Sequence, residues 1–194
     1  SYEMLRNRSE LDFDYVFMIV LAAIICFFGF RMNNPAVIIG SMVISPLLYS
    51  LVSAVSSIFY LDIKTFLKKL YSLAITIMLI IVVSFLFASL FDFPVSSEVI
   101  KRLLASHTDY FLVAFFSGIA GTFTFYWPGI LEAVTGIAIS VALIPPVVLL
   151  GIGLAIADIS IVNSSEAIIL INLLGIVLGA SLVVFSLKVQ TRKT

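Results

Sequence analysis

Long apolar stretches separated by short charged clusters run along the whole chain. Six such blocks span residues 13–30, 35–60, about 70–91, 110–126, 133–157 and 167–187. A helix needs roughly 20 apolar residues to cross a bilayer. Strands of membrane barrels alternate apolar and polar positions over about ten residues, whereas these blocks are continuously apolar. The pattern therefore predicts an all-α polytopic membrane protein of about six transmembrane helices, forming one transmembrane domain over residues 1–194.

The connectors between the blocks are short and polar. The turn-like Asn33-Asn34-Pro35 precedes the second block, and Pro35 suits the first turn of a helix because its missing N–H is not needed there. We expect residues 158–166 to form a polar loop. Between residues 92 and 109, apolar positions recur at helical spacing at Val99, Ile100, Leu103 and Leu104. An interfacial amphipathic helix and a plain connector explain this stretch equally well.

Basic residues predict the orientation in the membrane. With six spans, one side carries eight of them: Arg6, Arg8, Lys64, Lys68, Lys69, Lys188, Arg192 and Lys193. The other side carries Arg31, Lys101 and Arg102. Because cytoplasmic loops are enriched in Lys and Arg, we expect both termini in the cytoplasm, in a prokaryotic plasma (inner) membrane.

The two halves of the chain, residues 13–91 and 110–187, correspond as pseudo-repeats. At an offset of 100 residues, Ile39, Ile44 and Pro46 align with Ile139, Ile144 and Pro146. Because each half has three spans, the second half enters the membrane from the opposite side. The sequence thus predicts an inverted repeat of three plus three helices, a construction common among secondary transporters.

Prolines inside the second and fifth blocks mark the candidate site. A proline within a helix removes a backbone hydrogen bond, and in hydrocarbon the freed carbonyl needs another partner. We therefore expect helices two and five to be broken. The substrate-binding candidates are Gly40, Ser41, Ser45, Pro46, Glu132, Gly136, Ser140, Pro145 and Pro146. Kinks that only improve packing explain the prolines equally well, and Glu132 is also explained by a position at the membrane edge, near the start of helix five.

Small and amide residues predict close helix packing. Gly175 and Gly179 form a GxxxG pair in the sixth block, and Gly118 and Gly121 follow Ala114 in the fourth. Such residues let transmembrane helices approach closely, and Asn172 can bond across a helix pair.

Composition narrows the function classes. The chain is 62% hydrophobic and 11% charged with no net charge, which gives no basic field for nucleic acid. A single cysteine and a single histidine offer no metal cluster. No motif of a nucleophile, a metalloenzyme or a phosphate-binding loop is present in the sequence. We expect no enzyme activity, no catalytic residues, no metal and no cofactor.

Two motifs resemble a known family. The segments NNPAVIIGSMVISPL at 33–47 and GIAISVALIPPV at 136–147 resemble the hydrophobic membrane domain family DUF389. Ser45 stands where the family often has alanine, and Tyr49-Ser50 where a small or proline-containing pair is common. The resemblance implies the six-helix architecture, with any N-terminal soluble domain lying outside this chain. It implies little about substrate.

Two function hypotheses remain open, with a third, a lipid-acting enzyme, the weakest. The leading one is a transporter or channel-like permeation protein for a small solute or ion. The alternative is a membrane scaffold or sensor subunit coupled to a soluble domain or partner proteins. Besides the lipid bilayer, we expect a homo-oligomer as partner, because a thin bundle of six helices is commonly completed by symmetry.

Overall fold

The computed structural model describes residues 12–93, 100, 107–126 and 132–191. At 48–49, 107–108, 124–126, 132–142 and 188–191 it describes the backbone alone. The described residues form helices joined by turns: α2 (Phe13–Arg31), α3 (Pro35–Ile44), α4 (Leu47–Phe59), α5 (Ile63–Leu90), α7 (His107–Tyr126), α8 (Glu132–Ala155) and α9 (Ile159–Thr191). The predicted all-α class is confirmed. Within the predicted amphipathic segment, Ile100 is helical and buried, and residues 99 and 101–106 lie outside the described part.

Polar side chains fix where the helices begin. The carboxylates of Asp12, Asp62 and Asp158 accept the backbone N–H groups of Tyr15, Thr65 and Ile161, at 2.9, 3.0 and 3.1 Å. Before α3, the Asn34 side chain accepts the N–H of Ala36 at 3.0 Å, with Pro35 in the first turn as predicted. Such caps satisfy N–H groups that have no partner inside the helix.

Two helices begin earlier than the sequence pattern predicted. The lysines before the third block lie within α5, and most of the predicted 158–166 loop forms the first turns of α9. The caps at Asp62 and Asp158 explain both differences, because they start each helix at the polar stretch itself. As a consequence, Lys69 lies on a helix face and not in a solvated loop.

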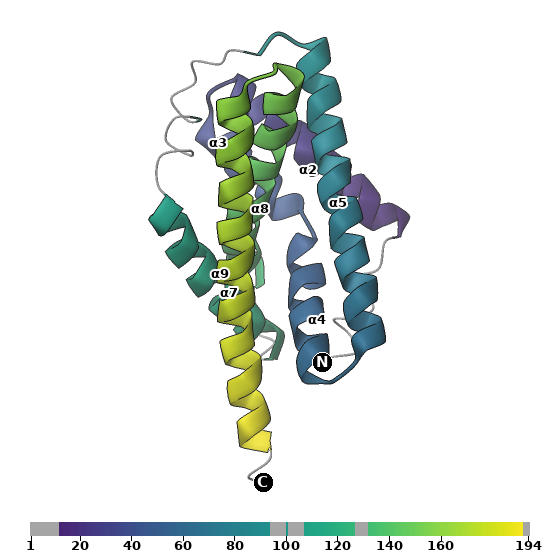
Figure 1. Cartoon of the computed structure of the whole chain (residues 1–194), viewed down its shortest axis with the longest axis vertical. Helices are drawn as coiled ribbons and strands as arrows, with labels where there is room; N and C mark the ends of the chain where they lie inside the picture. The colour runs from purple at the N-terminus through teal and green to yellow at the C-terminus, as the bar shows by residue number, and fades with distance from the viewer. Residues whose placement is uncertain (1–11, 94–99, 101–106, 127–131, 192–194) are drawn as a thin grey trace.

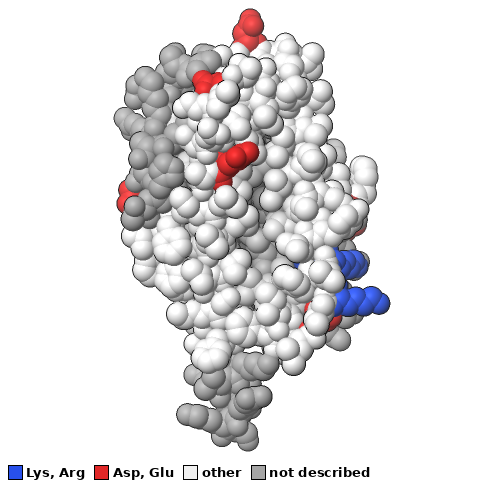
Figure 2. Space-filling model, in the orientation of Figure 1, with Lys and Arg blue, Asp and Glu red and all other residues white. Residues whose placement is uncertain are grey.

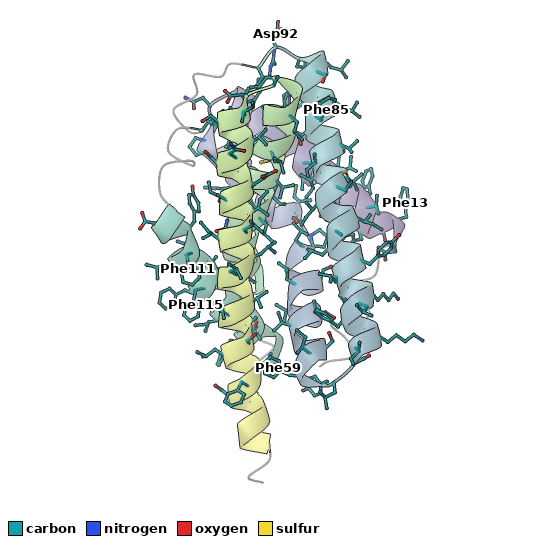
Figure 3. The ribbon with its side chains drawn as sticks, viewed as in Figure 1. Phe13, Phe59, Phe85, Asp92, Phe111 and Phe115 are labelled. Carbon is teal, nitrogen blue, oxygen red and sulfur yellow. The ribbon has the colours of Figure 1, made fainter. Side chains whose placement is uncertain are left out.

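Three helices are long and apolar enough to cross a membrane, judged by length and composition: Phe13–Arg31, Ile63–Leu90 and Ile159–Leu187. Pro35–Ile44, Ser50–Phe59, Asp109–Phe123 and Leu143–Ala155 are shorter apolar helices within the described residues. Large apolar side chains such as Met78 and Phe85 on α5, and Leu170 and Leu174 on α9, are exposed. In Figure 3, Phe13 and Phe85 lie on the outside of the bundle. These features indicate an integral membrane protein.

Most of the helices run roughly along the vertical of Figure 1, and α2 crosses the view obliquely. α5 rises from the lower end, whereas α7 and α9 descend, and the turns 60–62 and 156–158 lie at opposite ends. α2 packs on α3 and α5, and α7 packs on α9. α4 contacts α5, α9, α7 and α8, and α8 contacts each of the other described helices, so α4 and α8 lie at the centre.

Charged side chains are few on the face of the molecule that Figure 2 shows. In Figure 2, the basic side chains of this face gather at the lower right, where α5 begins with the exposed Lys64 and Lys68. Most of the acidic side chains lie in the upper half, and Figure 3 places Asp92 at the top. Most of this face is uncharged, and a surface of this kind is suited to lipid.

Candidate functional site

The second apolar block is interrupted at Ser45-Pro46, as predicted. α3 ends at Ile44, Ser45 is extended with φ −78° and ψ 128°, and α4 begins at Leu47. Pro46 has no N–H to continue the α3 ladder. The Ser45 hydroxyl accepts the Leu47 N–H at 3.4 Å, and the Ser45 N–H donates to the Met42 carbonyl at 3.3 Å. The serine therefore satisfies part of the backbone that the break exposes.

The predicted break in the fifth block is wrong. α8 continues through Pro145 and Pro146 without interruption. Both prolines lie in a stretch, residues 143–150, that is buried throughout. α8 packs against α5 and α9 on the two sides and also against α3 and α2. Dense packing of this kind holds a proline-containing helix together despite the lost backbone bonds.

The remaining predicted site residues take different positions. Ser41 is buried and its hydroxyl donates to the Ile38 carbonyl at 2.6 Å, whereas Gly40 is exposed with open space beside it. Ser45 is buried and Pro46 is half-buried. The side chains of Glu132 and Ser140 and the surroundings of Gly136 lie outside the described residues. Because α3 packs on α8, the structure brings helices that carry the two proline motifs together.

The predicted packing glycines lie between α7 and α9. A side chain at Gly118 would meet the backbone of Ile176, and one at Gly175 would meet Ala114 and the Phe111 carbonyl. One at Gly179 would meet the Phe115 carbonyl. Figure 3 shows Phe111 and Phe115 on α7. Gly121 and Asn172 are buried as well.

A set of buried polar residues lies between α4 and α5, and the sequence analysis did not predict it. All the described side chains of α4 from Leu47 to Ser57 are buried, and many of them are serines. On α5, a lysine and two hydroxyl residues follow one another along the buried face. We call this group the polar seam: Ser50, Ser53, Ser56, Lys69, Ser72 and Thr76.

One end of the polar seam is closed by a hydrogen-bonded link. The Tyr15 hydroxyl of α2 lies 3.1 Å from the Ser50 hydroxyl and 3.2 Å from the Thr76 hydroxyl. Thr76 also bonds to the Ser72 carbonyl at 2.8 Å. These bonds connect three helices in the interior. They satisfy hydroxyl groups that would otherwise be buried without a hydrogen-bond partner.

The middle of the polar seam is different. The hydroxyl oxygens of Ser53, Ser56 and Ser72 are buried and bond to no protein group. Ser57, next to Ser56 on α4, and Ser84, further along α5, instead bond to carbonyls of their own helices, at 2.7 and 2.6 Å. Buried hydroxyls are nearly always hydrogen-bonded, so these three are suited to bind water or a polar solute.

The spacing of the seam residues is a signal that the sequence does contain. Ser50, Ser53 and Ser56 recur every three positions, and Lys69, Ser72 and Thr76 recur every three or four. Such spacing places side chains on one helix face. The signal was missed because serine is tolerated in apolar helices, and because Lys69 was assigned to a cytoplasmic loop.

The described residues contain no cluster of His, Cys, Asp and Glu that could hold a metal ion. Cys26 is buried in α2 as a free thiol. The site is therefore built from hydroxyls, backbone groups and one lysine.

Comparison with known proteins gives a family and one distant relative. The chain is 25% identical over 185 residues to the uncharacterized protein MJ0678 of Methanocaldococcus jannaschii. The aligned region covers 95% of this chain and 57% of that protein. The chain thus spans little more than half the length of this relative. No solved structure matches. The family model described as "Domain of unknown function (DUF389)" matches residues 42–178, which contain α4, the polar seam and the double proline. The chain belongs to the DUF389 family.

Proposed function

We propose that this protein is a membrane transporter or channel-like permeation protein for a small solute or ion. The observation that carries the proposal is the buried helix α4. It begins at a proline break and is buried on all its described faces from Leu47 to Ser57, yet it bears a line of hydroxyls. A polar, interrupted helix at the centre of an apolar bundle is costly unless it serves a path or a site.

The arrangement of the helices supports an inverted repeat of three plus three spans. The first and third helices of each half are neighbours, α2 with α5 and α7 with α9. The middle helix of each half contacts the outer helices of the other: α4 touches α7 and α9, and α8 touches α2 and α5.

The turns of the two halves also match. Leu61 and Ala157 both have positive φ, 57° in each case, and each is followed by a capping aspartate. Both turns follow the middle helix of their half. In this repeat Pro46 breaks its helix and Pro145-Pro146 does not, so the two halves would contribute unequally to the site.

Flux measurements test the proposal. The purified chain is reconstituted into liposomes, and efflux of small anions, cations and neutral polar solutes is compared with protein-free liposomes and with liposomes containing heat-denatured protein. We expect flux above both controls for at least one solute class. Flux equal to the controls for every class would contradict the proposal.

A scaffold or sensor subunit is the second candidate. Leu170, Leu174, Leu178 and Leu182 form an exposed ridge with a spacing of four residues along α9. Such a ridge fits a second helix as well as it fits lipid. Absence of flux together with a stable homo-oligomer, lost on changing these leucines to alanine, would favour this candidate.

A further inference from the structure

Tyr15 joins three helices at one level of the bundle. Its hydroxyl lies 3.1 Å from the Ser50 hydroxyl of α4 and 3.2 Å from the Thr76 hydroxyl of α5. The Tyr15 side chain is only 4% exposed. Among the described residues, α2 packs on α3, α5 and α8 but only sparsely on α4. The bond to Ser50 therefore holds α4 to α2 where little other packing does.

Two hydrogen bonds fix the register of α2 along α5. Tyr15 bonds to Thr76, and the Arg31 guanidinium donates to the Asp92 carbonyl at 3.1 Å. The bonded residues are 61 positions apart in both cases. The two helices therefore lie side by side in the same direction, in one register from Tyr15 to Arg31.

Tyr15 lies where the buried surface of α5 changes from polar to apolar. In the shared register the next pair beyond it is Ile19 with Ile80, and both are 0% exposed. On the other side, towards the hairpin turn between α4 and α5 (Figure 1), come Ser53 and Ser72. Their hydroxyls are buried and have no hydrogen-bond partner among the described residues. The polar seam therefore ends at Tyr15.

The same link holds the first turns of α4, just after the break at Pro46. Ser50 is one turn beyond this proline, which supplies neither an N–H nor a side-chain acceptor to the helix. Two long hydrogen bonds cross the break. The Ser45 N–H donates to the Met42 carbonyl at 3.3 Å, and the Leu47 N–H donates to the Ser45 hydroxyl at 3.4 Å. Helix ends joined in this way are suited to act as a hinge.

Opening the link costs little, because its hydroxyls have other partners within reach. The Thr76 hydroxyl also lies 2.8 Å from the Ser72 carbonyl of its own helix, so it keeps a bond when Tyr15 leaves. A serine in a helix can likewise bond to a carbonyl one turn back, as Ser57 of α4 does at 2.7 Å. The net cost of release is therefore about that of one hydrogen bond.

We propose that Tyr15 is the latch of the polar seam, and that the structure shows the latch closed. Its release lets the start of α4 swing about Ser45 and Pro46, which exposes Ser53 and the neighbouring seam hydroxyls to water. This opening stands on the hydrogen bonds and the helix break alone. Its use in admitting a solute rests on the proposed function.

The latch is tested by the rate at which a small, charged thiosulfonate reagent modifies Ser53→Cys. The rate is followed by mass spectrometry on proteoliposomes, in a Cys26→Ala background. Because Ser53 is 0% exposed, modification requires an opening of the bundle. We expect Tyr15→Phe to raise the rate by about threefold to tenfold, the scale of one hydrogen bond. Thr76→Val is expected to raise it in the same direction, which keeps the test decisive if Tyr15→Phe fails to fold.

Matched controls separate opening of the latch from general loosening. Ala180→Cys on α9 is also 0% exposed, and this helix takes no part in the link. We expect Tyr15→Phe to leave its modification rate unchanged. Tyr71→Phe, on the exposed face of α5, is expected to change neither rate. An equal rise at both cysteines, or no rise at Ser53→Cys, would overturn the inference.

Modification and flux distinguish the latch from the transport function. A Ser53→Cys rate that rises with Tyr15→Phe, in a protein that carries no solute, supports the latch and contradicts transport. Flux through the wild type, together with a Ser53→Cys rate that Tyr15→Phe leaves unchanged, supports transport and overturns the latch.

Discussion

The buried hydroxyl groups of the polar seam differ in their hydrogen bonding. Tyr15, Ser50 and Thr76 bond to one another across three helices, whereas Ser53, Ser56 and Ser72 are buried without a protein partner. The contrast lies within about two turns of the same helix pair. It separates a structural part of the polar seam from a part that is free to bind a ligand.

The Tyr15 link predicts a measurable loss of stability. Tyr15→Phe leaves the hydroxyls of Ser50 and Thr76 without this bonding partner while keeping the ring. We expect the free energy of unfolding in mixed micelles to fall by about 1 kcal/mol, the scale of polar contacts in membrane proteins. Tyr71→Phe, on the exposed face of α5, is the matched control and is expected to change it little. Equal effects of the two substitutions would show that the link is not stabilising.

At the scale of helices, glycines set the spacing between α7 and α9. The predicted small-residue positions 118, 175 and 179 lie at this contact, where a Cβ at Gly118 would come within 2.9 Å of the Ile176 Cα. Real packing does not allow such an approach, so the helices would have to separate. Gly40 is the opposite case, because nothing lies within 4 Å of a Cβ placed there.

Alanine substitutions at Gly118 and Gly40 are expected to have opposite effects on thermal stability. Gly118→Ala is expected to lower the midpoint of thermal unfolding in detergent by several degrees, corresponding to about 1–3 kcal/mol of overpacking. Gly40→Ala is expected to raise it slightly, because alanine favours the helix by up to about 1 kcal/mol. A Gly118→Ala protein as stable as the wild type would contradict the close α7–α9 packing.

Much of the helical architecture was predictable from the sequence. The predictions that the structure corrected each have an identifiable physical reason. Apolar blocks located the helices, and Pro46 located a break, because the helical ladder could not continue there. The double proline in α8 was misjudged, since tertiary packing around residues 143–150 keeps that helix continuous. The burial of Lys69 could not be inferred from charge clustering, because it depends on the Asp62 cap that starts α5 early.

The whole molecule exposes many large apolar side chains and few charged ones on the face that Figure 2 shows. Lys64 lies at the beginning of α5 and Asp92 just beyond its end, so the two mark opposite ends of one long helix. The positive-inside tendency assigns the lysine end to the cytoplasm. This orientation remains a prediction.

Cysteine labelling tests the orientation. In a Cys26→Ala background, a membrane-impermeant maleimide is expected to label Asp92→Cys in intact cells. It should label Lys64→Cys only after permeabilisation, because both positions are exposed but lie on opposite sides. Labelling of Lys64→Cys alone in intact cells would invert the orientation. Labelling of both would contradict the transmembrane position of α5.

The proposed transport function predicts that a solute passes the unpartnered hydroxyls of the polar seam, and a cysteine at position 53 tests this prediction. Flux through Cys26→Ala/Ser53→Cys in liposomes is measured before and after treatment with a small, charged thiosulfonate reagent. We predict that treatment abolishes flux, while the Cys26→Ala protein is unaffected. Unchanged flux through a fully modified Ser53→Cys protein would show that the solute does not pass the polar seam.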